Sequence, residues 1–266
     1  MSIKSPLYQV KQYLKYLMVS QTRYTIHSPF VFDLVNNVLR DTTFYDDFVV
    51  LEEMKSDLFQ RNDVIETVDF GAGAGMKKYA TKVGHLGRMV KLRSQRKQQL
   101  GILYRLTRHF KPDYMLEFGT AAGISASYLK KGHPQGHLIT MEGCASLAAV
   151  AEQVFNDIEI NDVEVKVGNF DAILPKILKN CPKLDFVFID GNHRKQPTLK
   201  YFDQCFPLAT ENSVFVFDDI HWSKGMDEAW KAIKSDPRVS LTIDLFWFGL
   251  VFFRKGIEKQ DFIIRY

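Results

Sequence analysis

Hydrophobic residues recur every three or four positions in two stretches near the N-terminus. Residues 7–18 and 29–39 both have this helical spacing. The second stretch has a clear start, because Ser28 can cap a helix and Pro29 suits its first position. We therefore predict two N-terminal helices, and we interpret the neighbouring His27 as a structural residue of the second helix start.

From residue 94 onward, helical spacing alternates with short apolar strands. Leu100, Leu103 and Leu106 lie on one face of a predicted helix that ends before Pro112. Five apolar strands follow, most of them separated by segments of helical length. They are residues 114–118, 137–141, 163–167, 184–189 and 213–217.

Strands that alternate with helices indicate a doubly wound, mostly parallel sheet with helices on both faces. Residues 239–245 and 248–254 predict a hairpin, so at least one C-terminal strand should be antiparallel. The predicted fold class is therefore α/β, with seven strands in the sheet and additional helices at the N-terminus.

The composition is that of a globular protein, with 46% hydrophobic and 25% charged residues among 266 positions. These proportions exclude a disordered, collagen-like or coiled-coil chain. No apolar stretch reaches the roughly 18 residues that a membrane span requires, and residues 1–10 do not resemble a secretory signal. Cys144, Cys181 and Cys205 lie far apart, which predicts reduced, buried thiols in a cytoplasmic protein.

The formal net charge of +4 conceals one strongly basic segment. Residues 70–112 contain 11 basic and no acidic side chains, whereas the residues on both sides are mildly acidic in sum. One interpretation is a surface at residues 77–111 that binds RNA or another polyanion, with steep salt dependence. A solvated helix face, or a contact with an acidic partner subunit, is the other interpretation.

Chemically active residues follow each of the five strands, at the end where parallel sheets bind their ligands. In chain order these are Gly119–Gly123, Glu142, Gly168–Asp171, Asp190–His193 and Asp218–His221. Glycines, carboxylates and histidines are thus delivered to one edge of the predicted sheet. This pattern predicts a binding site there.

The first of these turns has two glycines, Gly119 and Gly123, but lacks the middle glycine of a dinucleotide site and the lysine of a phosphate loop. Glu117 precedes the turn, which suits a cationic ligand without phosphates. Glu142 lies 19 residues beyond Gly123 and can accept both hydroxyls of a ribose. A ribose and a positive charge without a pyrophosphate describe S-adenosylmethionine (SAM).

Residues 116–123, with Glu142 after them, resemble the class I SAM-dependent methyltransferases. The nearest branch is the catechol and caffeoyl-CoA type O-methyltransferases, to which residues 188–193 and 218–222 are also similar. The resemblance covers residues 94–254, about 60% of the chain. It implies a Rossmann-like methyltransferase domain at residues 94–266, preceded by a helical and basic lid or linker segment at residues 1–93. Homodimers are common in this branch.

The resemblance also implies which residues bind SAM. They are Glu117, Gly119, Thr120, Gly123, Ser125, Glu142, Asn169, Phe170 and Asp190. Asp190, Asp218 and Asp219 stand where the branch holds a divalent metal such as Mg²⁺, with Asp219 replacing an asparagine. His193 replaces a lysine that helps to deprotonate the acceptor, and a histidine can do this near neutral pH.

We therefore expect O-methylation of a small-molecule hydroxyl, with His193 and Asp190 as catalytic residues. The alternatives are a methyltransferase acting on RNA or another polyanion, and a non-catalytic binding protein with this fold. We interpret His221 as structural, and Trp222 either as part of the acceptor pocket or as a buried helix start. The glycine run at residues 71–75 is expected to be a mobile segment entering the site or an ordinary linker.

Overall fold

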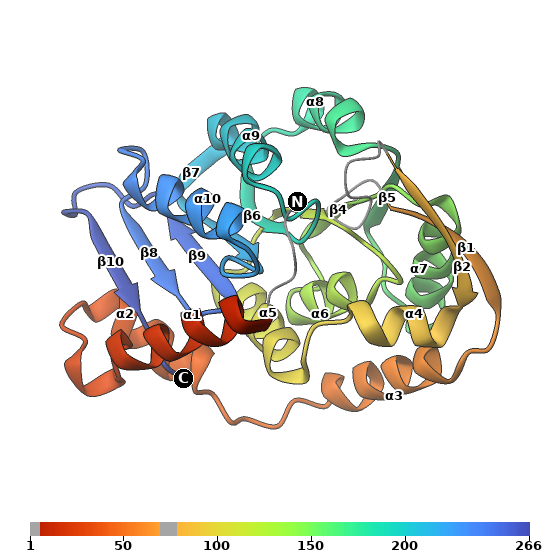
Figure 1. The fold of residues 1–266 in the computed structure, drawn as a ribbon, viewed down its shortest axis with the longest axis horizontal. Coiled ribbons are helices and arrows are strands. Elements are labelled where there is room, and N and C mark those ends of the chain that lie inside the picture. The colour runs from red at the N-terminus through yellow and green to blue at the C-terminus, as the bar shows by residue number, and fades with distance from the viewer. Residues whose placement is uncertain (1–5, 70–78) are drawn as a thin grey trace. The chain divides into compact units, whose positions relative to one another are not determined.

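The computed structural model describes residues 6–69 and 79–266 (Figure 1). The chain divides into two units, which we call the terminal unit, Met1–Arg40 with Ile177–Tyr266, and the central unit, Asp41–Lys176. The glycine run at residues 71–75 lies outside the described residues. The domain boundary between residues 93 and 94 stays a prediction.

One large sheet dominates the structure, and it is parallel except at β9. Its strands are β3 (Tyr114–Phe118), β4 (His137–Glu142), β5 (Val163–Val167), β6 (Leu184–Ile189), β7 (Ala209–Asp218), β8 (Leu241–Asp244), β9 (Phe248–Phe252) and β10 (Gln260–Ile263). The strand order is β10-β8-β9-β7-β6-β3-β4-β5. β9 runs antiparallel to β7 and β8, whereas β3–β4, β4–β5, β6–β7 and β8–β10 are parallel pairs. The predicted fold class is confirmed, with β10 as an unpredicted eighth strand.

The central unit surrounds β3, β4 and β5 with helices. These are α3 (Asp47–Gln60), α4 (Leu86–Arg93), α5 (Lys97–Phe110), α6 (Ile124–Gly132), α7 (Ala145–Asp157) and the first part of α8 (Phe170–Asn180). Leu100, Leu103 and Leu106 on α5 are fully buried, which confirms the predicted apolar face. Thr107 Oγ1 also donates to Leu129 O at 2.9 Å, so α5 packs closely on α6.

A two-stranded antiparallel ribbon in the central unit was not predicted. It consists of β1 (Val64–Asp69) and β2 (Ala80–His85), with Val64 opposite His85. Helix α3 precedes the ribbon and buries Leu51, Met54 and Leu58 at helical spacing. Part of the predicted lid or linker is therefore regular secondary structure.

The terminal unit contains β6 to β10, with helices from both ends of the chain. These elements are α1 (Pro6–Val19), η1 (Arg23–Thr25), α2 (Pro29–Leu34), η2 (Val35–Leu39), α9 (Lys195–Cys205), η4 (Phe206–Leu208) and α10 (Lys224–Ser235). Val31 N–H donates to Ser28 Oγ at 3.5 Å, which confirms the predicted cap.

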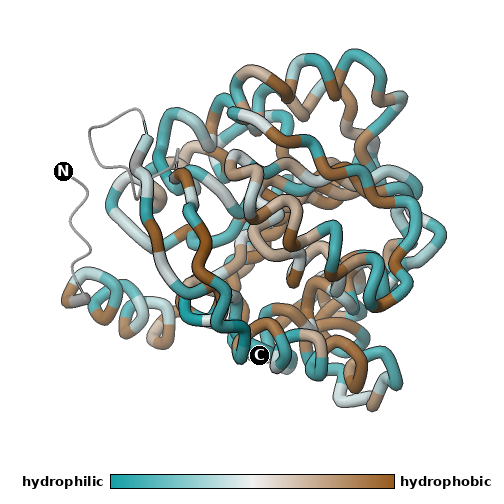
Figure 2. The backbone as a smooth tube through the Cα atoms, turned by 90° about the vertical axis from the view of Figure 1, so that its right-hand side faces the viewer, coloured by the Kyte–Doolittle hydropathy of each residue, from teal (hydrophilic) through white to brown (hydrophobic). Residues whose placement is uncertain are grey.

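Helix α1 is anchored to the C-terminal strands of its own unit. Tyr16 OH donates to Ile264 O at 2.5 Å, and its ring lies 5.4 Å from that of Phe246. Hydrophobic and hydrophilic residues alternate along this helix (Figure 2). Among the described residues, no helix combines the length and the apolar character needed to cross a membrane.

Candidate active site

The turn between β3 and α6 contains the two glycines predicted to lie beside the cofactor. Gly119 and Gly123 have φ angles of +100° and +84°, and Ala121 between them has +47°. Glycine suits these left-handed angles because a Cβ atom crowds the backbone there. The N–H groups of Gly119 and Thr120 donate to Met141 O at 2.9 and 3.1 Å. The turn is therefore held against the end of β4.

Glu117 forms a buried network that fixes the start of α6. Ser125 Oγ donates to Glu117 Oε1 at 2.6 Å, and Thr140 Oγ1 donates to Oε2 at 2.5 Å. The hydroxyls of Thr120 and Thr140 lie 2.6 Å apart. Three of the predicted cofactor residues thus form one hydrogen-bonded group. Because both carboxylate oxygens of Glu117 accept hydroxyls of the chain itself, this group joins β3, β4 and α6.

The carboxylate of Glu142, at the end of β4, joins the glycine turn to the following loop. Ala121 N–H donates to Oε2 and Cys144 N–H to Oε1, both at 2.8 Å. Burial raises the pKa of Glu142, and the backbone hydrogen bonds oppose this shift. A carboxylate offers about four lone-pair positions, so this one can still accept a hydroxyl of a ribose.

Asn169 and Phe170 follow β5 at the start of α8. Asp171 N–H donates to Asn169 Oδ1 at 2.9 Å, so the asparagine caps this helix. The half-buried ring of Phe170 lies edge-on to that of Phe118, with 5.7 Å between the ring centres. Direct contact of either residue with a cofactor stays a prediction.

Sequence reasoning missed the contact between the ribbon and the loop after Glu142. Ser146 Oγ donates to Glu66 O at 2.5 Å, and Cys144 Sγ donates to the same oxygen at 3.8 Å. The charge of Arg93, at the end of α4, also acts to lower the pKa of Glu142. The ribbon pairing behind these contacts is long-range and has no local sequence signal.

In the terminal unit, three carboxylates gather after β6 and β7, as predicted. Asp218 is only 6% exposed, and it lies close enough to Asp190 for the two carboxyl groups to interact. Its burial, together with the charges of Asp190 and Asp219, raises its pKa well above the usual range. Within the described parts of the chain, the buried Oδ1 of Asp218 has no hydrogen-bond partner.

His193 lies beside the first of these carboxylates. Its Nε2 is 3.4 Å from Asp190 Oδ1, and its ring centre is 6.2 Å from that of Trp222. His193 thus lies between Asp190 and the half-buried Trp222. A catalytic role for His193 and Asp190 stays a prediction, as does a place for Trp222 in the acceptor pocket.

The loop between Asp190 and His193 has strained backbone and a second unsatisfied atom. Asn192 and His193 have φ angles of +67° and +36°. Asn192 Nδ2 donates to Tyr201 OH at 3.1 Å, whereas its buried Oδ1 has no partner among the described residues. The sequence analysis did not single out Asn192, because only the folded loop shows this oxygen to be buried.

His221 is held between two carboxylates, consistent with a structural role. Its Nδ1 lies 3.0 Å from Asp227 Oδ1 and its Nε2 lies 2.8 Å from Asp244 Oδ2. Burial alone would lower the pKa of His221, but the two carboxylates raise it to about 9. Trp230 Nε1 also donates to Asp244 Oδ2, at 3.1 Å.

The carboxylates after β6 and β7 are oxygen ligands of the kind that a hard divalent cation prefers. A cation would compensate the unpartnered oxygen of Asp218 and the repulsion that raises its pKa. Mg²⁺ binds through one or two carboxylates and keeps several waters. Among the described residues, however, no group of three or more His, Cys, Asp or Glu side chains is arranged to hold a metal.

Comparison with known proteins identifies the kind of domain that these residues form. The sequence model of a family described as "Methyltransferase domain" matches residues 116–220. Catechol O-methyltransferase of Mus musculus is 27% identical over 124 residues, which cover 45% of this chain and 46% of that protein. The chain thus spans about half the length of this curated relative.

Two solved structures with the same fold contain the cofactor or its demethylated product. The O-methyltransferase TomG from Streptomyces achromogenes, in complex with SAM, is 24% identical with a TM-score of 0.53, covering 61% of this chain and 82% of that chain. The O-methyltransferase from Bacillus cereus, in complex with SAH, is 18% identical with a TM-score of 0.55, covering 82% and 94%. Residues 116–220 therefore match a methyltransferase domain family, in a chain with the fold of these two O-methyltransferase structures.

Proposed function

We propose that this chain transfers the methyl group of SAM to a hydroxyl oxygen of a small-molecule acceptor. The observation that carries the proposal is the Glu142 carboxylate, held at 2.8 Å by N–H groups from both the glycine turn and its own loop. When bound, SAM supplies an electrophilic methyl group. The chain must then bind both reactants, orient them, remove a proton and exclude water.

Glu142 accepts the ribose hydroxyls in this proposal. Gly119 and Gly123 let the backbone approach the cofactor without side chains in between. Glu117, Thr120 and Ser125 hold that turn through their buried network, and Asn169 and Phe170 border the adenine. The 2.6 Å bond from Ser125 Oγ to Glu117 Oε1 supports a positioning role for this network.

His193 removes the proton of the acceptor hydroxyl in this proposal. Asp190, at 3.4 Å from His193 Nε2, orients the imidazole and stabilises its protonated form. The neighbouring Trp222 ring provides an apolar wall for a small acceptor.

Asp190, Asp218 and Asp219 would supply the carboxylates for a divalent cation such as Mg²⁺, with one or two of them as direct ligands and waters as the remaining ones. A bound cation would lower the pKa of an acceptor hydroxyl. The unpartnered Oδ1 of Asp218 supports this assignment. Chelation should reduce turnover and Mg²⁺ should restore it, whereas activity that survives complete chelation would exclude a required metal.

The cofactor assignment is tested by calorimetry with SAH. Glu142→Gln should weaken SAH binding by about tenfold or more, because it removes a charged hydrogen-bond acceptor. Glu152→Gln is the matched control, since Glu152 is exposed on α7. Equal SAH affinities of the two variants would show that Glu142 does not bind the cofactor.

The acceptor assignment is tested with methyl-labelled SAM and a panel of catechols and other small hydroxyl compounds. His193→Gln should lower turnover by about 10²–10⁴-fold at unchanged SAH affinity. His27→Gln is its control, because His27 is exposed at a helix start. Unchanged turnover in His193→Gln would exclude the base role. A chain that binds SAH but methylates no compound of the panel would contradict the acceptor class.

A further inference from the structure

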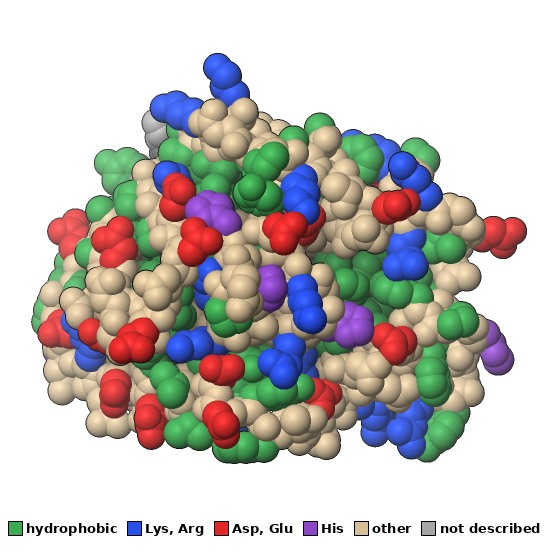
Figure 3. All heavy atoms as spheres, turned by 180° about the vertical axis from the view of Figure 1, so that it is seen from behind, with side chains coloured by type: hydrophobic (Ala, Val, Ile, Leu, Met, Phe, Trp, Pro, Cys, Tyr) green, Lys and Arg blue, Asp and Glu red, His purple; other side chains and the backbone are tan. Residues whose placement is uncertain are grey.

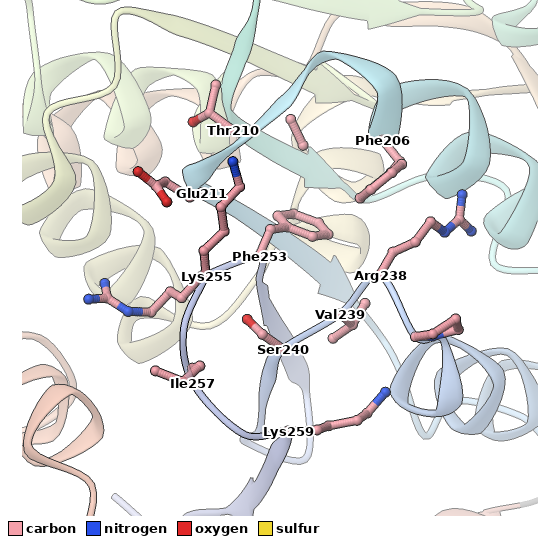
Figure 4. A pocket seen from close by; sticks show the side chains of 13 residues that line it. Phe206, Thr210, Glu211, Arg238, Val239, Ser240, Phe253, Lys255, Ile257 and Lys259 are labelled. Carbon is pink, nitrogen blue, oxygen red and sulfur yellow. The ribbon is translucent and has the colours of Figure 1, made fainter.

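A hollow of about 530 Å³ lies within the terminal unit, away from the carboxylates (Figure 4). Three separate segments line it: residues 206–211 at the start of β7, residues 237–240 before β8, and residues 253–259 between β9 and β10. Its volume is in the range of small-molecule sites. We call it the cationic pocket.

The charges around the cationic pocket are mostly of one sign. Its charged lining residues are Arg238, Arg254, Lys255, Lys259 and the single acid Glu211. Figure 3 shows acidic and basic side chains interspersed on one face of the molecule. Grouped cations around a hollow attract anions, because their fields add there.

Two of these cations are held in place at the end of α10. Arg238 forms ion pairs with Asp203 and Asp236, at 2.5 and 2.6 Å from its Nη2, so two carboxylates offset its charge. Its guanidinium lies 4.6 Å from the ring centre of Phe206. Lys259 Nζ donates to Asp236 O at 2.6 Å. An ammonium group has three N–H donors, so Lys259 has further donors to offer an anion.

The other two cations lack a carboxylate partner. Within the described parts of the chain, neither Arg254 nor Lys255 forms an ion pair. Arg254 lies over the ring of Phe30, at 4.3 Å from its centre. No carboxylate of the described residues therefore pairs with either positive charge.

The walls between these cations are apolar. Val239 and Phe253 line the pocket and are 1% and 8% exposed. The ring of Phe253 lies 5.5 Å from that of Phe206, so the aromatic wall is packed. An apolar wall beside separated cations suits a compact ligand that carries several anionic groups.

The cationic pocket is distinct from the carboxylates that we assign to the acceptor. Strand β7 is ten residues long, begins at Ala209 in the pocket lining and ends at Asp218. A strand of this length spans about 30 Å, since each residue advances it by about 3.3 Å. A ligand in the pocket therefore cannot touch Asp218.

We propose that the cationic pocket binds a small polyanion, with two or more carboxylate or phosphate groups contacting Lys255 and Lys259. This site is separate from the methyl-transfer site and does not depend on it. Its ligand should bind equally well with and without SAH.

The test is calorimetry on the full chain at low salt, with citrate and pyrophosphate as probes. We expect saturable binding of at least one probe, unchanged by saturating SAH. Binding of citrate alone would assign the site to carboxylates, and binding of pyrophosphate alone would assign it to phosphates. If neither probe binds at about 10 mM, a concentration well above the Kd of typical specific sites, the proposal is overturned.

The variants locate the binding. The double variant Lys255→Gln/Lys259→Gln should lower the affinity for the probe by about five- to tenfold, because two exposed charge contacts are lost. Lys179→Gln removes one charge from an exposed position outside the pocket and is the control. If Lys179→Gln weakens binding as much as the double variant, the probe responds to net charge and the pocket is excluded.

Discussion

Replacing Gly123 by alanine tests the geometry on which the cofactor site depends. Gly123 has a φ angle of +84° and stands directly before α6. A Cβ atom there would lie 2.9 Å from Phe155 Cε1 and 3.1 Å from Ala151 Cβ. Both neighbours are buried side chains of α7 and have little room to move. The substitution therefore combines backbone strain with a steric overlap.

These two effects have separate magnitudes. An L-residue in the left-handed region costs about 1–2 kcal/mol, and overpacking of a dense interior adds about 1–3 kcal/mol. Gly256 provides a matched control, because its φ angle is +73° but nothing lies within 4 Å of its Cβ position. Gly256→Ala should therefore cost only the first amount, about 1–2 kcal/mol. Gly123→Ala should cost about 2–5 kcal/mol in total.

The two variants are compared by urea unfolding, followed by fluorescence and circular dichroism. We expect Gly123→Ala to lower the free energy of unfolding by at least about 1 kcal/mol more than Gly256→Ala does. Calorimetry should also show weaker SAH binding for Gly123→Ala alone, because the turn carries the N–H group that holds Glu142. Equal unfolding free energies for the two variants would refute the steric argument.

Two further predictions concern buried polar groups. Ser125→Ala removes the donor to Glu117 Oε1 and should lower the free energy of unfolding by about 1–3 kcal/mol, whereas Ser56→Ala, at an exposed position of α3, should change it little in the same urea titration. Burial alone would raise the pKa of Asp227, but hydrogen bonds from His221 and Lys231 lower it to about 2. The depressed pKa stabilises the fold above pH 3.8, by about 2 kcal/mol, and this contribution is lost as the pH falls through 2. Asp227→Asn should therefore lose about 1 kcal/mol less than the wild type between pH 5 and pH 3, and equal losses would show that Asp227 is not involved.

The sequence predicted the strands that carry strong local patterns. The bounds of β3, β5 and β6 were predicted to the residue, because each is a short run of strand formers between helical segments. β10 was missed because its four residues, Gln260–Ile263, are half polar and form an edge strand against β8. The ribbon was missed because Ala80–His85 becomes a strand only by pairing with Val64–Asp69.

The site was predictable where it depends on strand ends, and not where it depends on backbone geometry. The places of Glu142, Asp190 and Asp218 at strand ends were predicted from the strand pattern, and their roles in binding stay predictions. The N–H donors of Ala121 and Cys144 could not be predicted, because nearly every residue has a backbone N–H group. Only the folded turn directs these two toward Glu142. The enclosed position of Glu117 was missed for the same reason, because burial follows from tertiary packing.

Strain and missing hydrogen bonds occur together in the loops after β6 and β7. Asn192, His193 and Asp219 have left-handed φ angles although none of them is glycine. Asn, Asp and His adopt such angles more readily than other side chains, but at some cost relative to glycine. The buried oxygens of Asn192 and Asp218, which have no partner among the described residues, add to that cost. Nothing in the folded loops offsets these costs, whereas a ligand that supplies a positive charge or a hydrogen-bond donor would offset them. These features support the proposed ligand site in these loops, and a ligand at Asp218 should then raise the stability of the fold as well as occupy the site.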